Sequence, residues 1–221
     1  MRQQGFRDER GQAFPVYIIV VVGLLFAALA FFVVGQAGVT RSNAQGAADA
    51  AALAAAGEAR DNTFTGLDLL GLTPADWAKL VHGDLLTGRG ACAKAAEFAA
   101  LNDAVAECEA AIPEVSVTVT TNGTVGESVV PGTESVHGKA TAKARIKPRC
   151  SLTSAPAPPS PTPTPDPTSS PTTSPTTSPS PTPGPGSVKF VCDGESLTLD
   201  LAHPGSLSKL AKALFAVRLI D

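Results

Sequence analysis

Charged and aromatic residues are both scarce in this chain of 221 residues. Charged residues make up 17%, below the roughly 25% that is usual for soluble domains, and aromatic residues make up 5%. Alanine supplies much of the apolar content, which predicts a thin core. No basic run alternates with aromatic residues. This absence excludes nucleic acid as a partner, because binding phosphates requires a positively charged surface.

Recognisable catalytic motifs are also missing. The sequence has no nucleophile elbow, no zinc-protease motif and no Walker-type glycine loop. His82, His137 and His203 are far apart, and each stands beside Gly or Pro, so we expect loop residues rather than metal ligands. We therefore predict a protein that is not an enzyme, with no cofactor, no metal and no small-molecule substrate. A hydrolase with an unfamiliar site is a further alternative, but no residue stands out to carry it.

The longest apolar stretch covers residues 14–34, FPVYIIVVVGLLFAALAFFVV, without a charge. As a helix, this length crosses a hydrocarbon core of about 30 Å. A cleaved secretory signal is the alternative, but its apolar region is usually about 7 to 15 residues long. Arg2, Arg7 and Arg10 precede the stretch and only Arg41 follows closely, which favours a cytoplasmic N-terminus. We expect a single-pass cell-membrane protein, embedded in the lipid bilayer, with an extracytoplasmic C-terminus.

Four cysteines, Cys92, Cys108, Cys150 and Cys192, are disulfide candidates. Their number is even and they lack the C-x-x-C spacing of zinc or redox sites, so disulfides are favoured over metal binding, with free buried thiols as the alternative. Sequential pairing would join Cys92 to Cys108 and Cys150 to Cys192. Four cysteines permit three connectivities, and spacing alone does not choose among them.

Composition divides the chain into segments. In residues 44–60, ten of 17 residues are Ala, the strongest helix former, so the membrane helix is expected to continue outward and to pack against a partner through small side chains. Interruption at Gly35, Gly38 or Gly46 is the alternative. Thirteen of the 19 prolines lie in residues 153–187, which predicts a disordered segment. The expected parts are a cytoplasmic N-terminus (1–13), a transmembrane helix (14–34), an Ala-rich juxtamembrane helix (35–60), an extracytoplasmic α+β domain (61–152), a Pro/Ser/Thr-rich disordered segment (153–187) and C-terminal strands with an amphipathic helix (188–221).

Two helices are expected after residue 60. Thr73-Pro74-Ala75-Asp76 predicts a helix start, with Trp77 anchoring a small core. Apolar spacing predicts a second helix over residues 91–111, ended by Pro113. A straight helix would hold Cys92 and Cys108 about 24 Å apart, whereas a disulfide requires Cα atoms about 4.4 to 6.8 Å apart. Either the helix breaks near residues 101–103 or the pairing is not sequential.

Strands are expected where the apolar period falls to two. Residues 114–121 and 137–147 alternate in this way, with Asn122-Gly123 as a turn, and residues 188–191 and 197–201 are expected to complete one small antiparallel sheet. Residues 205–221 read as an amphipathic helix. The expected class is α+β.

Residues Arg10-Gly11-Gln12-Ala13, the apolar span and the alanine run of residues 47–56 resemble the N-terminal segment of TadG-like and TadE-like proteins of Flp, or tight-adherence, pilus assembly. The resemblance covers about residues 10 to 60, and the stretch from Ala91 to Cys108 with the strand after it resembles the TadE-like domain. It implies an anchored extracytoplasmic domain, a role in assembling or anchoring pili, and other pilus or secretion-machine membrane proteins as partners.

One departure from processed prepilins concerns position 16. Such prepilins carry Glu five residues after the cleavage Gly, whereas here that position, counted from Gly11, is Val16. This favours a membrane-retained accessory or minor-pilin-like component over a major pilin. The alternative is an envelope adhesin or wall-associated binding protein, with the Pro-rich segment as a spacer and the cell wall as a further candidate partner.

Overall fold

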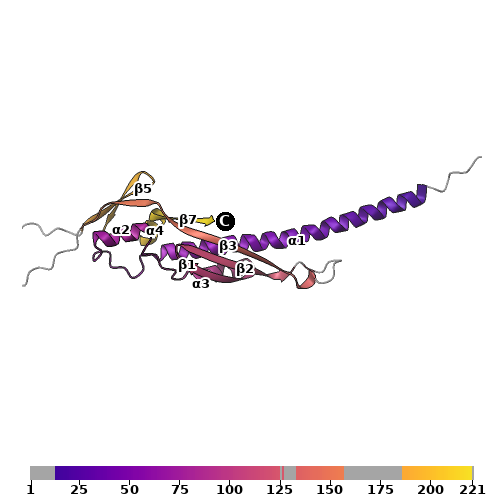
Figure 1. Cartoon of the computed structure of the whole chain (residues 1–221), viewed down its shortest axis with the longest axis horizontal. Helices are drawn as coiled ribbons and strands as arrows, with labels where there is room; N and C mark the ends of the chain where they lie inside the picture. The colour runs from indigo at the N-terminus through magenta and orange to yellow at the C-terminus, as the bar shows by residue number, and fades with distance from the viewer. Residues whose placement is uncertain (1–12, 125, 127–132, 157–185, 221) are drawn as a thin grey trace, which may run out of the picture.

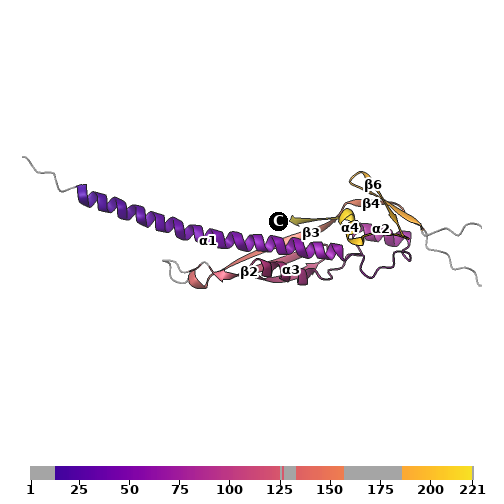
Figure 2. The ribbon, with the colours of Figure 1, turned by 180° about the vertical axis from the view of Figure 1, so that it is seen from behind.

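One long helix organises the molecule (Figure 1). The computed structural model describes residues 13–124, 126, 133–156 and 186–220. Helix α1 (Ala13–Asp61) is 49 residues long, or about 74 Å at 1.5 Å per residue. Its first part protrudes, and its second part packs against one sheet and two helices of the folded domain (Figure 2). Gly35, Gly38 and Gly46 do not interrupt it, so the prediction of a continuous outward helix is confirmed.

A four-stranded antiparallel sheet lies along the second part of α1. Its strand order is β1-β2-β3-β7. The valines of β2 at positions 115, 117 and 119 are fully buried on the side that faces α1, whereas the residues between them are partly exposed. Helix α3 (Ala91–Leu101) also packs against α1 and β1. The strands are β1 (Ala104–Ala111), β2 (Glu114–Thr124), β3 (His137–Pro148) and β7 (Phe215–Ile220).

A second, three-stranded sheet lies at the end of the domain opposite the protruding helix (Figure 1). It consists of β4 (Cys150–Ser154), β5 (Ser187–Cys192) and β6 (Glu195–Asp200), paired antiparallel. Helix α2 (Pro74–His82) packs against β4, and its Trp77 is fully buried with its ring centre 6.0 Å from that of Phe190. Trp77 therefore anchors this part of the core. The remaining elements are η1 (Thr133–Ser135) and α4 (Leu207–Leu214).

The α+β class is confirmed, as is the start of α2 after Thr73. The predicted helix over residues 91–111 is wrong beyond Leu101. Asp103 has a φ of 51°, and residues 104–111 pair with β2 as strand β1. The alternation of Glu107 and Glu109 with half-buried Ala106 and Cys108 suits a strand, and pairing overrides the helix propensity of alanine.

The C-terminal prediction is also partly wrong. The helix expected over residues 205–221 ends at Leu214, and Phe215 is extended (φ −132°, ψ 131°). From there β7 pairs with β3, because six mostly apolar residues gain ladder hydrogen bonds on an open sheet edge. The strand near residue 188 pairs with β4, and the strand near residue 197 pairs in turn with that strand, so both belong to the second sheet and do not complete the first.

Two smaller expectations need correction, and a third concerns residues that the structure does not describe. Asn122-Gly123 belongs to β2, at a register shift between Thr120 and Thr124, and does not form the turn. His82 ends α2 and His137 opens β3, so neither is a loop residue. Most of the predicted disordered segment, residues 157–185, lies outside the described residues.

Candidate membrane anchor and interaction surfaces

The first part of α1 exposes large apolar side chains on all sides. Phe14, Phe26 and Phe31 have exposed fractions of 72%, 75% and 80%. Such exposure is costly in water and favourable in a lipid interior. In the described part of the chain, α1 is the helix long and apolar enough to cross a membrane, judged by length and composition.

The second part of α1 is rich in alanine, and eight of its alanines are buried. They recur at alternating spacings of three and one, which places them on one face of the helix. Against this face lie β2, β3 and α3. The expectation that the Ala-rich extension packs against a partner is therefore wrong for this face, because the small side chains admit the chain's own sheet. The eight alanines, each at most 1% exposed, are Ala44, Ala47, Ala48, Ala51, Ala52, Ala55, Ala56 and Ala59.

Cys92 and Cys108 are brought together by a reversal of the chain. Helix α3 carries Cys92 near its start, and β1 returns past it with Cys108. Their Cα atoms lie 5.4 Å apart, and the two residues form a disulfide. The helix break considered near residues 101–103 is thus what brings these two cysteines together.

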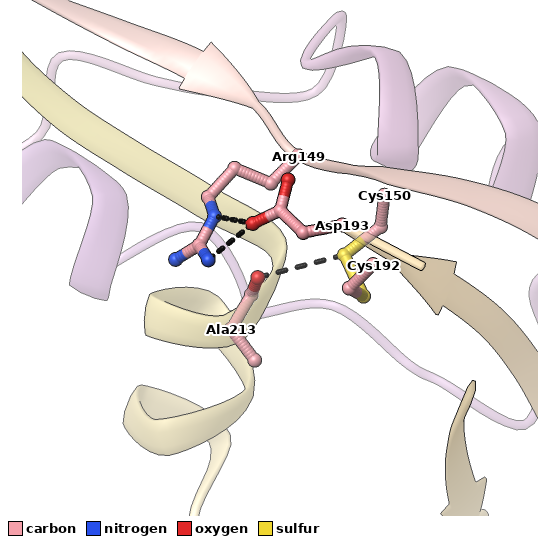
Figure 3. Close-up of a disulfide and its surroundings, with 5 residues drawn as sticks. All are labelled: Arg149, Cys150, Cys192, Asp193 and Ala213. Carbon is pink, nitrogen blue, oxygen red and sulfur yellow. Dashed lines mark hydrogen bonds and ion pairs between the residues drawn. A yellow bond between two sulfur atoms is a disulfide. The ribbon is translucent and has the colours of Figure 1, made fainter. Parts of the chain in front are cut away.

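Cys150 and Cys192 form the second disulfide, as direct partners on β4 and β5 with Cα atoms 4.0 Å apart (Figure 3). Beside it, Arg149 Nε donates to Asp193 Oδ2 at 2.7 Å, and the backbone N–H of Arg149 donates to the carbonyl of Leu214. The Sγ of Cys150 lies 3.5 Å from the Ala213 carbonyl, a contact rather than a hydrogen bond because a disulfide sulfur carries no hydrogen. These contacts tie both sheets to α4.

The outward face of the four-stranded sheet separates charges by strand. On β1, Glu107 and Glu109 lie opposite Thr118 and Ser116 of β2. Thr118 and Ser116 in turn lie opposite β3, whose side chains on this face include lysines and an arginine. Arg145 pairs with Glu114 across strands, Nε to Oε1 at 2.9 Å. Both side chains are exposed, so this pair contributes little stability. The basic residues on this face of β3 are Lys139, Lys143, Arg145 and Lys147.

Two titratable groups outside the span have perturbed pKa values. Hydrogen bonds from the Thr73 hydroxyl and backbone N–H lower the pKa of the Asp76 carboxyl, and Lys79 adds a smaller charge effect. A hydrogen bond to Glu97 raises the pKa of Lys94. Both groups are partly exposed on helix surfaces, where such pairs support helices and point to no reaction.

An open hollow of about 500 Å³ lies between α1 and the end of the sheet nearest the protruding helix. Its lining is mainly polar, including Ser42, Asn43, Asn102 and Asp103, with Leu101 at its side. Among residues 13–124, 126, 133–156 and 186–220, no group of three or more His, Cys, Asp or Glu side chains could hold a metal ion.

The helix that carries the exposed span and the buried alanines is also the part that resembles known proteins. Residues 11–58 match the family model described as Putative Flp pilus-assembly TadE/G-like. This confirms the resemblance inferred over about residues 10 to 60. The comparisons with curated proteins and with solved structures gave no match.

The TadE/G-like segment, residues 11–58, coincides with nearly the whole of α1. Together with the exposed apolar span, it indicates a single-pass, membrane-anchored protein with a role related to pilus assembly and with pilus or secretion-machine components as partners. The sheets lie beyond the match. Their strands β1, β4 and β7 are the elements that sequence reasoning missed, although the period-two alternation of Glu107 and Glu109 was a signal for the first.

Proposed function

We propose that the chain is a non-catalytic accessory or minor-pilin-like component of Flp pilus assembly, anchored by residues 14–34 of α1. The observation that carries this proposal is the coincidence of the TadE/G-like segment with one helix that both protrudes as an apolar span and forms a wall of the folded domain. Such a helix forms a rigid connection between the domain and the membrane that holds the span. The chain therefore serves to position a domain at a membrane.

The proposed orientation has the N-terminus in the cytoplasm and the domain outside it. Arg2, Arg7 and Arg10 before the span support this, because basic residues are retained on the cytoplasmic side. The two disulfides support it as well, since disulfides persist in oxidising, extracytoplasmic compartments. Protease added to intact cells should then digest the domain and spare the N-terminus. The intact mass should fall short of the reduced mass by four hydrogens.

The proposed pilus partners contact the span and the outward sheet face, because the alanine face of α1 is already filled by the chain's own sheet. In the bilayer, residues 14–34 can exchange lipid contacts for contacts with apolar helices of neighbouring subunits.

The test is an exchange of the span in the native cells. Deleting the protein should abolish Flp pili, and the intact protein should restore them. A variant with residues 14–34 replaced by an unrelated apolar helix of equal length separates anchoring from specific packing. A variant with Leu70, an exposed residue of the distal loop, changed to Ser is the matched control and should restore pili fully. Normal pili after deletion would reject the proposal.

An envelope adhesin is the second candidate. It is favoured by the position of β4 and β5, whose facing ends flank residues 157–185 and lie in the sheet farthest from the span (Figure 1). The Pro-rich segment is thus attached where a wall or surface ligand would be met. Normal pili combined with lost adhesion after removal of residues 157–185 would support this candidate.

A further inference from the structure

The large apolar side chains that are exposed beyond the span are unevenly distributed. They are Val39, Leu53, Leu70, Leu101, Val105, Val136, Val191 and Leu219. Four of them, Val39, Leu101, Val105 and Val136, lie at the end of the domain from which α1 protrudes. We refer to these four as the proximal rim. Their exposed fractions are 60%, 72%, 63% and 49%, respectively.

Contacts between β3, α4 and α1 place the rim next to the span. A Cβ built on Gly138 lies 2.7 Å from the carbonyl oxygen of Thr40, so β3 begins level with Thr40 on α1. Val136 precedes that point by two residues. At the other end, Lys212 reaches Asp61 at 3.5 Å, so the domain extends away from the span as α1 does. Val136 therefore lies on the span side of the contact between Gly138 and Thr40.

The rim is completed by the ends of α3 and β1. Leu101 ends α3 and shares the hollow with Ser42 and Asn43 of α1. Val105 lies opposite Thr120, and Thr120 lies opposite Lys139. Because Lys139 follows Gly138 directly, Val105 lies at the same end of the sheet as Gly138. The rim thus combines exposed apolar side chains with a polar hollow, the composition that suits a membrane interface.

The length of the uncharged part of α1 brings this rim down to the bilayer. No charge occurs between Arg10 and Arg41, and α1 contains residues 13–40 of that run. The apolar span, residues 14–34, measures about 32 Å along the helix, close to a hydrocarbon core of about 30 Å. The six uncharged residues that follow, 35–40, add about 9 Å, which is comparable to the depth of the headgroup region on one side of the bilayer. Because α1 is unbroken, the proximal rim, which begins at Val39, lies at the level of the lipid headgroups.

We propose that the proximal rim is a docking surface for the lipid bilayer, with Val136 and Leu101 entering the interface. The proposal rests on the anchoring part of the proposed function. A bilayer is the favoured occupant because the rim is continuous with the span on the same rigid helix. A zwitterionic bilayer suffices, since the rim presents apolar groups and the charged residues near it carry both signs, with Arg41 and Lys139 against Asp103 and Glu134.

The test measures the depth of single residues in reconstituted vesicles. The four native cysteines are paired, so one added cysteine can be labelled with an environment-sensitive fluorophore under non-reducing conditions. The full chain with Leu101→Cys or Val136→Cys is placed in phosphatidylcholine vesicles. Lipids spin-labelled at the headgroup or deep in the acyl chain serve as quenchers. Phe26→Cys reports on the span, and Leu70→Cys, 53% exposed at the distal end, is the matched control.

The expected result is loss of fluorescence from the Leu101 and Val136 probes with the headgroup quencher, together with a blue shift of their emission. The Phe26 probe should be quenched by the deep label, and the Leu70 probe by neither. A second variant should reverse the effect. Leu101→Glu, combined with Val136→Cys, should restore the fluorescence of the Val136 probe, whereas Leu70→Glu should not.

The outcomes separate the rim from the anchor. Quenching at Phe26 without quenching at Leu101 and Val136 would overturn the rim proposal and leave the anchor intact. No quenching at any position would overturn both. Protection of the rim probes only in native membranes, and not in pure lipid, would identify the rim as a protein interface and would also overturn the proposal.

Discussion

At the scale of single residues, the closest approach between the sheet and α1 occurs at Gly138. A methyl group there would meet the Thr40 carbonyl oxygen at 2.7 Å and the Ala44 Cβ at 3.2 Å. Because backbone has to move, we predict that Gly138→Ala lowers the free energy of unfolding by about 1 to 3 kcal/mol, the usual cost of overpacking. Denaturant unfolding in detergent measures this change.

The control for this substitution is Gly123→Ala in the neighbouring strand, where an added Cβ has nothing within 4 Å. It should change the stability by no more than a few tenths of a kcal/mol. Equal effects of the two substitutions would show that β3 does not approach α1 as the structure has it.

A second prediction at this scale concerns the titration of Asp76. Its carboxylate accepts hydrogen bonds from the Thr73 hydroxyl at 2.7 Å and from the Thr73 backbone N–H at 3.2 Å, which lowers its pKa from the ordinary value of 3.8. The folded pKa lies below the unfolded one, so its contribution to stability is present above the unfolded pKa and is lost as the pH falls through the folded pKa.

An NMR titration of the Asp76 carboxyl checks this prediction. The midpoint should lie below 3.8 and rise toward it in Thr73→Ala, whereas Thr73→Ser keeps the hydroxyl and should keep the low midpoint. An unchanged midpoint in Thr73→Ala would mean that the capping box does not form in solution.

At the scale of elements, the alanine face of α1 permits the sheet to approach closely. Ala52 is fully buried on this face. We predict that Ala52→Leu lowers the free energy of unfolding by about 1 to 3 kcal/mol, because the larger side chain has to displace neighbouring strands. Gln45→Leu, at an exposed position of the same helix, should have little effect. A stable Ala52→Leu protein would place this face against solvent or lipid instead.

Elements with local signals, including the strands marked by period-two alternation, were predicted, whereas β1 and β7, whose strand character depends on distant pairing, were not. The Thr73-Pro74 start of α2 and the long apolar and Ala-rich α1 follow from neighbouring residues. The apolar spacing from Ala95 to Val105 predicts a helix that includes β1, and only the ladder of this segment with β2 makes it a strand. Strand β7 depends on β3, whose residues precede it by about seventy positions.

The same reasoning explains the interaction surfaces. The span was predicted because a run of apolar residues needs no tertiary information. The surface expected on the alanines was wrong, since small side chains invite close packing by any neighbour, and the neighbour is the chain's own sheet. The proximal rim combines residues from α1, α3, β1 and the start of β3, which no local pattern joins.

At the scale of the whole molecule, α1 is both anchor and core. We predict that a chain lacking residues 1–38 is soluble and folded, because the alanine face begins at Ala44. A chain lacking residues 1–61 should be unfolded, since the wall that buries Val115, Val117 and Val119 is gone. Circular dichroism and limited proteolysis distinguish the two. A cooperatively folded chain that starts at residue 62 would contradict this prediction.

The amino-acid sequence by itself determined the membrane span, the helical character of residues 13–61 and the capped start of α2, because each depends on residues within a few turns of one another. It also determined that four cysteines were available for two disulfides. Only the tertiary structure decided which cysteines pair, which alanines are buried, and that residues 104–111 and 215–220 are strands. These depend on hydrogen bonds and contacts between distant segments, whose cost in chain entropy is met only when the whole fold forms.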